Sequence, residues 1–237
     1  MKLSAPINRL KRNARLLARD KNIPLHAALD RVARNEGFSS WSLLSAHAAQ
    51  SRPAAGLFTR LQNGDVLLLG ARPGQGKTLR GLELLVDAER KDRQAVFFTL
   101  DYSEEETRTH LEKLADTGVC AEGNLEIVAS DDISAAFVMQ HLAKSAAGTV
   151  AVIDYLQILD QQRTKPALAE QLTALSGFAR EKGIVLVFLS QIDRSFDART
   201  KALPDIKDIR LPNPVDLKLF TKACFIHGKA SSFVALQ

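Results

Sequence analysis

The sequence predicts an α/β fold, with helices on both faces of a mainly parallel central sheet, and a small helical module before it. From residue 61 onward, continuous apolar runs alternate with segments of helical spacing, the pattern of a parallel sheet buried on both faces. Polar residues suited to phosphate chemistry follow several of these runs. Residues 1–50 show helical patterns only. We therefore divide the chain into a basic helical module (1–50), a linker (51–60) and an α/β domain (61–237).

Composition excludes several classes of protein. The chain has 237 residues, of which 46% are hydrophobic, enough for a sizeable core. No apolar run is long enough to span a bilayer, and the N-terminus lacks the apolar core of a signal peptide, so we expect a cytoplasmic location and no membrane partner. The only cysteines, Cys120 and Cys224, indicate no disulfide framework. The five histidines form no ligand-spaced cluster, so no zinc site is expected.

The positive charge of the chain is concentrated in the helical module. Residues 1–50 hold nine lysines and arginines against three aspartates and glutamates, a net charge of +6. The other 187 residues hold 23 lysines and arginines against 24 aspartates and glutamates, a net charge of −1. This asymmetry suggests a contact of the module with nucleic acid or with an acidic protein. A solvated basic helix face explains it equally well.

Three helices are predicted in the module. Apolar residues recur at helical spacing over 8–20, Pro24 opens a second helix that ends at Gly37, and a third begins at 39–41. Phe38 and Trp41 are the expected core of this bundle. A helix-turn-helix DNA reader is one arrangement that the pattern allows.

The α/β domain begins with an apolar strand, and strands then alternate with helices to the C-terminus. Ser103 and Glu106 form a capping-box pattern at the start of one helix. The predicted strands are 65–70, 95–100, 125–129, 149–154, 184–189, 220–227 and 232–236, and the predicted helices are 78–92, 103–117, 131–147 and 166–182.

The stretch between the first strand and the first helix of this domain has the layout of a phosphate-binding loop. The pattern is G-x-x-x-x-G-K-S/T, and Gly76, Lys77 and Thr78 match its end. Ala71 takes the place of the first glycine, with Gly70 just before it. We expect the whole stretch to bind nucleotide phosphates: Ala71, Arg72, Pro73, Gly74, Gln75, Gly76, Lys77 and Thr78.

The residue types of this loop suit a polyphosphate. Gly74 and Gly76 let backbone N–H groups approach phosphate without a Cβ in the way, and the following helix adds the positive end of its dipole. Lys77 would reach the β- and γ-phosphates of ATP, and the Thr78 hydroxyl would ligate Mg²⁺. The alternative is a glycine-rich strand-to-helix turn that binds nothing.

Three further polar residues stand where predicted strands end, the edge at which parallel sheets bind ligands. Asp154 follows Val-Ala-Val-Ile and is the expected Mg²⁺ carboxylate. Asp101 is the candidate to orient and deprotonate the attacking water, or else it caps the next helix. Gln191 is a candidate sensor of the γ-phosphate, or else an ordinary loop amide.

Five ordered motifs, taken together, resemble the motor domain of DnaB-type replicative helicases, a RecA-like family. They are Ala71–Thr78, Phe98–Ser103, Ile153–Gln157, Ser190–Arg194 and Asp208–Arg210. An Ala-Arg-Pro opening of the loop is a family trait. The resemblance implies a RecA-like P-loop NTPase, and a ring-shaped hexamer that hydrolyses ATP between subunits and moves along single-stranded DNA. It also makes Arg210 a candidate DNA contact.

The chain departs from the family pattern at positions that act on the γ-phosphate. Asp101 stands where the family usually has Glu, and is one methylene shorter. Lys229 is the only candidate to replace the family's finger arginine, which acts across the subunit interface. Leu211-Pro-Asn-Pro214 replaces the family's DNA-contacting loop. These departures leave three alternatives: a DNA-dependent ATPase motor, a nucleotide-dependent switch or accessory protein with weak or no hydrolysis, and a degenerate scaffold whose function lies in the module.

Overall fold

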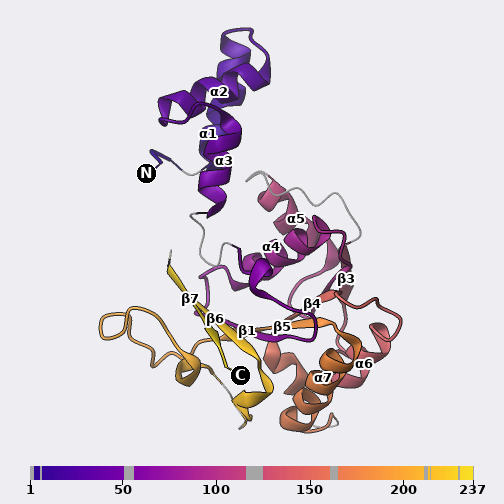
Figure 1. The fold of residues 1–237 in the computed structure, drawn as a ribbon. Helices are drawn as coiled ribbons and strands as arrows, with labels where there is room; N and C mark the ends of the chain where they lie inside the picture. The colour runs from indigo at the N-terminus through magenta and orange to yellow at the C-terminus, as the bar shows by residue number, and fades with distance from the viewer. Residues whose placement is uncertain are drawn as a thin grey trace.

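The computed structural model describes residues 3–5, 7–50, 56–115, 125–160, 165–210, 213, 215–228 and 230–236. A seven-stranded sheet forms its centre (Figure 1). Its strands are β1 (Val66–Ala71), β2 (Ala95–Thr99), β3 (Leu125–Ala129), β4 (Val150–Asp154), β5 (Val185–Gln191), β6 (Lys222–His227) and β7 (Ala230–Ala235).

The strand order is β3-β2-β4-β5-β1-β6-β7, and every pairing is parallel except that of β6 with β7. The carboxyl ends of β1, β2, β4 and β5 therefore meet at one edge of the sheet. Strand β5 lies between β1 and β4, with Ala71 opposite Gln191 and Asp154 opposite Leu189. This register brings the residues that follow four separate apolar runs to a common site.

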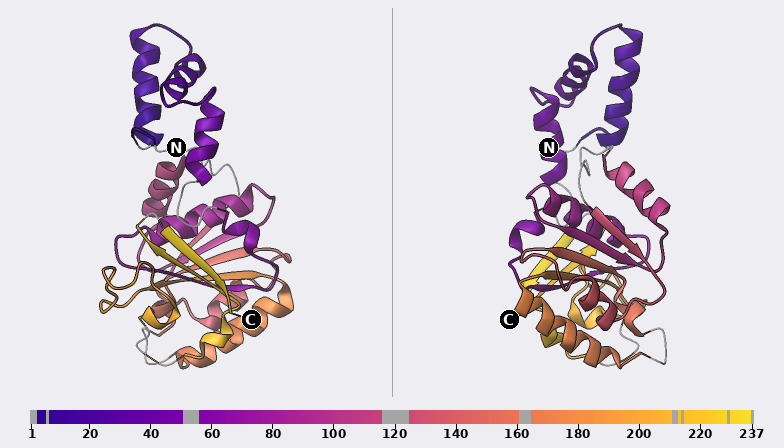
Figure 2. Two further views of the ribbon diagram at one scale, coloured as in Figure 1. Left: turned by 60° about the vertical axis from the view of Figure 1, so that its left-hand side comes forward. Right: turned by 90° about the vertical axis from the view of Figure 1, so that its right-hand side faces the viewer.

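Helices cover both faces of the sheet. Figure 1 shows α4 and α5 on one side and α6 and α7 on the other, and the turned views of Figure 2 agree. No helix among the described residues has the length and apolar character needed to cross a bilayer. The helices of this domain are α4 (Lys77–Glu89), α5 (Glu104–Ala115), α6 (Ala135–His141) and α7 (Leu168–Lys182), with short 3₁₀ turns η1 (Phe58–Arg60), η2 (Leu156–Asp160), η3 (Ile206–Asp208) and η4 (Leu217–Leu219).

The apolar runs are strands buried on both faces, as predicted. Along β1, Val66 and Leu68 belong to the core beneath α6 and α7, whereas Leu67 and Leu69 belong to the core beneath α4 and α5. All six residues of β1 are buried. Two-sided burial explains why the sequence of this strand is continuously apolar instead of alternating.

Several predicted element boundaries are wrong by two or more residues, and those of α6 and β5 differ as follows. Helix α6 covers only Ala135–His141 of the predicted 131–147, and it starts late because the Ser134 side chain accepts a hydrogen bond from Phe137 N and caps the helix there. Strand β5 continues past residue 189 to Gln191, because Ser190 and Gln191 still pair with β1. The longer strand carries the polar end of β5 to the edge where β1 ends.

The N-terminal module has a separate core of aliphatic residues, three of which are alanines. Its helices are α1 (Ile7–Asp20), α2 (Leu25–Asn35) and α3 (Trp41–Gln50). Ala14, Ala28 and Ala33 are fully buried between them. Phe38 and Trp41, the expected core, are only partly buried against this cluster. They border the core instead of forming its centre, because helices that meet at alanines leave little room between them for aromatic rings.

A buried carboxylate joins the start of β1 to β6, which is more than 150 residues away in sequence. Asp65 accepts hydrogen bonds from Gln62 N at 2.6 Å and from the Thr221 hydroxyl at 2.8 Å, and it forms an ion pair with Lys222. We expect Asp65→Ala to lower the free energy of unfolding by about 3 kcal/mol, because it leaves Lys222 without its anion in a largely buried place. Urea denaturation measures this loss.

Asp132→Ala, at an exposed position, is the matched control and should change stability by less than about 0.5 kcal/mol. Equal urea midpoints for Asp65→Ala and the unmodified protein would show that the Asp65 contacts contribute nothing.

Candidate phosphate-binding site

The predicted phosphate-binding loop joins β1 to α4 through two residues with left-handed backbone. Gly74 has φ +76° and Gly76 has φ +77°, values that side-chain-bearing residues rarely adopt. A Cβ at either glycine would meet no atom within 4 Å, so the backbone conformation, and not crowding, requires glycine here. Helix α4 begins directly at Lys77, which places its N-terminus at the loop.

The two polar residues that open α4 both bind one buried carboxylate. Lys77 Nζ lies 2.6 Å from Asp154 Oδ1, and the Thr78 hydroxyl donates to Asp154 Oδ2 at 2.6 Å. The Asp154 side chain is 0% exposed and that of Lys77 is 13% exposed. Lys77 Nζ also lies 5.2 Å from the centre of the Tyr155 ring, a cation–π distance. The sheet register thus brings together three residues that the sequence predicted to share a site.

The donor set suits a magnesium ion that is also held by nucleotide phosphates. Mg²⁺ usually takes only one or two protein oxygens in such sites and keeps several waters. The Thr78 hydroxyl and the Asp154 carboxylate offer two hard oxygen donors that already share a hydrogen bond. Among the described residues, no group of three or more histidine, cysteine, aspartate or glutamate side chains is placed to hold a metal.

Asp101 follows β2 at the same edge of the sheet and does not cap α5. That role belongs to Ser103 and Glu106, whose side chains bind each other's backbone N–H groups as the capping-box pattern predicts. Partial burial, and then repulsion from Asp154, raise the pKa of the Asp101 carboxyl, while Lys77 opposes the shift. The carboxylate of Asp101 is therefore a stronger base than an ordinary aspartate.

A pH dependence follows if Asp101 accepts the proton of the attacking water. Only its carboxylate form is active, so ATP turnover should rise with pH through a pKa higher than that of an ordinary aspartate. Asp101→Asn should remove this acidic limb and reduce turnover about 100-fold. Initial rates measured across the acidic and neutral pH range provide the test, and an unchanged profile in Asp101→Asn would exclude Asp101 as the base.

The end of β5 is hydrogen-bonded to the segment that carries Arg210. Arg210 N donates to the carbonyl oxygen of Gln191 at 2.8 Å, and the Gln157 side chain donates to the carbonyl oxygen of Arg210 at 2.6 Å. Gln157 also lies 3.5 Å from the Ser190 hydroxyl. Both the backbone N–H and the backbone carbonyl of Arg210 are therefore hydrogen-bonded, while the residue itself is exposed. Sequence reasoning assigned no role to Gln157, although this residue is the last of the Ile153–Gln157 motif.

Two side chains of the loop contact segments that are distant in sequence. The Gln75 side chain accepts a hydrogen bond from Gly228 N at 2.8 Å, at the turn between β6 and β7. Arg72 donates to the carbonyl oxygen of Phe196 at 3.3 Å, and the Phe196 and His227 rings pack with their centres 5.6 Å apart. The β6–β7 turn therefore lies beside the loop. No local sequence signal could have predicted these contacts. The two hydrogen bonds join residues more than 100 positions apart, and the contact between the Phe196 and His227 rings depends on the strand order.

Other sequence predictions lie outside the described residues. Lys229, the candidate substitute for a finger arginine, is one, and so are Pro212 and Pro214 of the loop after Arg210.

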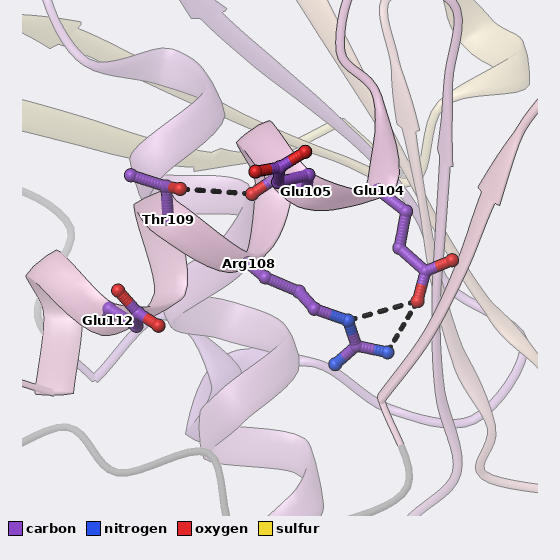
Figure 3. Close-up of a pocket in the computed structure, with 5 residues that line it drawn as sticks. All are labelled: Glu104, Glu105, Arg108, Thr109 and Glu112. Atoms are coloured by element: carbon purple, nitrogen blue, oxygen red, sulfur yellow. Dashed lines mark hydrogen bonds and ion pairs between the residues drawn. The ribbon is translucent and has the colours of Figure 1, made fainter.

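A surface hollow of about 520 Å³ lies along α5 and contains none of the predicted site residues. Figure 3 shows that its side chains come from this one helix, with Arg108 paired to Glu104. It therefore offers no set of groups converging from different elements. Its lining is Glu104, Glu105, Arg108, Thr109 and Glu112.

Comparison with known proteins shows what the α/β domain is similar to. Residues 110–215 match the DnaB-like helicase C terminal domain family. Because of this similarity we call residues 61–237 the DnaB-like domain. The matched range includes Asp154, Gln191 and Arg210, whereas the predicted phosphate-binding loop and Asp101 precede it.

Curated relatives extend the similarity of the DnaB-like domain over more of the chain. The replicative DNA helicase DnaB of Synechocystis sp. is 28% identical in a match 182 residues long, which covers 63% of this chain and 21% of that protein. The replicative DNA helicase DnaB of Helicobacter pylori strain J99 is 25% identical in a match 201 residues long, which covers 69% of this chain and 41% of that protein. The chain thus corresponds to less than half the length of these relatives.

Two solved structures share the fold of the DnaB-like domain. One, described as an ATPase domain, has a TM-score of 0.58 at 18% identity, over 79% of this chain and 80% of its own. A DnaB-like replicative helicase, studied with its interactions with primase, has a TM-score of 0.59 at 16% identity, over 91% of this chain and 65% of its own. At these identities the similarity shows the fold alone, a RecA-like α/β domain.

Proposed function

We propose that the DnaB-like domain binds Mg-ATP at the loop of residues 71–78 and hydrolyses it in a motor that acts on single-stranded DNA. The observation that carries this proposal is the cluster of Lys77, Thr78 and Asp154. A phosphate-binding loop, the helix N-terminus behind it and a buried carboxylate on a neighbouring strand meet at one edge of the sheet. This is the arrangement that holds the phosphates and the metal of a nucleotide.

Each proposed role uses a group at that edge. Lys77 exchanges part of its interaction with Asp154 for the β- and γ-phosphates, and Thr78 and Asp154 hold the metal. Bound Mg²⁺ supplies charge neutralisation at the phosphate oxygens. Asp101, with its raised pKa, accepts the proton of the attacking water. Gln191, at the end of β5 and directly opposite Ala71, contacts the γ-phosphate.

Action on DNA is proposed from the contact between the end of β5 and the Arg210 segment. Because Arg210 N donates to the Gln191 carbonyl, a displacement of Gln191 by the γ-phosphate also displaces the backbone of Arg210. Its exposed guanidinium is the proposed contact to a DNA phosphate. A hexameric ring, with Lys229 acting on the nucleotide of the neighbouring subunit, completes the proposal.

A nucleotide-dependent switch is the second candidate, and the chemistry of four positions favours it. Asp101 is shorter than the glutamate usual in this family, and Lys229 lacks the planar fork of an arginine finger. Two prolines, at 212 and 214, remove backbone donors from the loop after Arg210. Such a protein would bind ATP, hydrolyse it slowly or not at all, and change its assembly or its affinity for a partner.

ATP turnover measured with and without single-stranded DNA tests the proposal. The motor requires turnover that depends on Mg²⁺ and increases when DNA is added. Tight ATP binding without stimulated turnover would instead identify the switch. Size measurement with and without ATP tests the ring independently of turnover.

The variant Asp101→Glu separates the two candidates further. If the short carboxylate limits hydrolysis, the added methylene should raise turnover several-fold. An unchanged or reduced rate would show that the length of this side chain is not the limiting feature.

A further inference from the structure

We propose that the exposed arginine face of α1 is a second nucleic-acid site, which binds the phosphate backbone independently of the nucleotide state of the DnaB-like domain. The apolar side of α1 is used in the core of the module, where Ile7, Leu10 and Ala14 are buried. The opposite side carries only one exposed large apolar residue, Leu16 at 56% exposure. Four exposed arginines on that side define the arginine face: Arg9, Arg12, Arg15 and Arg19.

Helix geometry aligns these arginines. At about 100° per residue, Arg12 and Arg19 lie about 20° apart around the axis, and Arg9 and Arg15 lie within about 60° of Arg12 on either side. At a rise of about 1.5 Å per residue, Arg12 and Arg19 are about 10 Å apart along the helix. Phosphates follow one another about every 3.4 Å along one strand of a duplex, so the face is long enough to contact more than one of them.

The acidic residues of the module form contacts that do not involve Arg12 or Arg19, the pair at the centre of the face. Asp30 accepts a hydrogen bond from Trp41 N at 2.9 Å and so anchors the start of α3. Glu36 accepts from Ser4 N at 2.8 Å, and Asp20 lies 3.6 Å from the neighbouring Lys21. Among the described residues neither Arg12 nor Arg19 forms an ion pair with a carboxylate, so the charge of the central pair is available to an external anion.

The chemistry of the face favours nucleic acid over a membrane or an acidic protein. Arginine binds phosphate through a planar pair of N–H groups, and six of the nine basic residues of the module are arginines. A helix that lies in a membrane needs a free apolar face, and that of α1 is already buried in the module. A protein interface needs an apolar centre, and Leu16 alone does not supply one.

Fluorescence anisotropy of the full chain with a labelled single-stranded DNA about 30 nucleotides long, without ATP, tests the proposal. The double variant Arg12→Ala/Arg19→Ala should weaken binding about tenfold or more. It should also make the slope of log Kobs against log salt shallower by about 1.4, which is about 0.7 for each single-strand phosphate that the variant no longer binds. The control Arg108→Ala/Arg199→Ala removes two exposed arginines outside the module and should leave affinity and slope unchanged.

A further variant and a further comparison keep the result interpretable. Arg12→Lys/Arg19→Lys retains the charge, so it should retain most of the salt slope and lose only part of the affinity. Comparing it with the alanine variant also shows whether the alanine variant loses affinity only because the module unfolds. The loss of affinity in Arg12→Ala/Arg19→Ala should be the same without nucleotide and with Mg²⁺ and a non-hydrolysable ATP analogue, so this proposal and the proposed ATPase can fail separately.

Equal affinity of the unmodified protein and Arg12→Ala/Arg19→Ala for DNA would overturn the proposal. So would tighter, Arg12- and Arg19-dependent binding to polyglutamate or to vesicles with anionic phospholipid, since the partner would then be an acidic protein or a membrane.

Discussion

Replacing Lys77 with methionine should reduce ATP turnover about 100- to 1,000-fold. Removal of one preorganised group that stabilises developing charge in a transition state typically costs about that factor. Lys77 is the group best placed to do so. It is the first residue of α4, and its largely buried ammonium nitrogen lies 2.6 Å from Asp154 Oδ1. Methionine keeps most of the length of the stem and its apolar packing. Single-turnover and steady-state assays, together with binding of a fluorescent ATP analogue, measure the effect.

The same substitution should also lower stability in the absence of nucleotide. It removes the cation from the buried Asp154 carboxylate and leaves the hydrogen bond from the Thr78 hydroxyl, and breaking a buried ion pair from one side costs about 3–5 kcal/mol. Lys144→Met, at an exposed position after α6, is the control and should change neither property. Turnover of Lys77→Met within a factor of about two of the unmodified protein would exclude the loop as the catalytic phosphate site.

The central strands of the fold could be predicted because burial on both faces makes their sequences continuously apolar. Element ends were harder, since polar contacts set them. A single serine cap starts α6 at Ala135, four residues after the predicted start. Strand β7 begins at Ala230 although residues 231 and 232 are serines, because pairing with β6 holds them in the sheet. Apolar spacing carries no information on either feature.

The residues of the site could be predicted from the sequence, but the hydrogen bonds that connect them to distant segments could not. A parallel sheet brings strand ends to one edge, so Lys77, Thr78 and Asp154 were expected to lie near one another, and they do. The strand order, with β5 between β1 and β4, depends on long-range packing. The bond from Gly228 N to Gln75 and the bond from Gln157 to the Arg210 carbonyl depend on that order. Both join a side chain to a backbone group, a kind of contact that leaves no pattern in the sequence.

Replacing Asp154 with asparagine should strongly reduce Mg²⁺-dependent turnover. It should lower the free energy of unfolding by less than Lys77→Met does. An asparagine oxygen still accepts a hydrogen bond from Lys77, and its amide can donate to the Thr78 hydroxyl, which accepts as well as donates. The buried negative charge disappears, so the cost is an unpaired lysine that is 13% exposed and able to reach water. The metal loses its only predicted carboxylate, and we expect turnover to fall about 100-fold or more.

The double variant Lys77→Met/Asp154→Asn separates the catalytic and structural parts of this pair. Since neither charge is left buried alone, its free energy of unfolding should exceed that of Lys77→Met, although each single change is destabilising. Its turnover should be no higher than that of either single variant, because both phosphate and metal contacts are gone. Urea denaturation and steady-state turnover on all four proteins complete the cycle. Strictly additive stability losses would mean that the 2.6 Å contact contributes no coupling energy to the folded state.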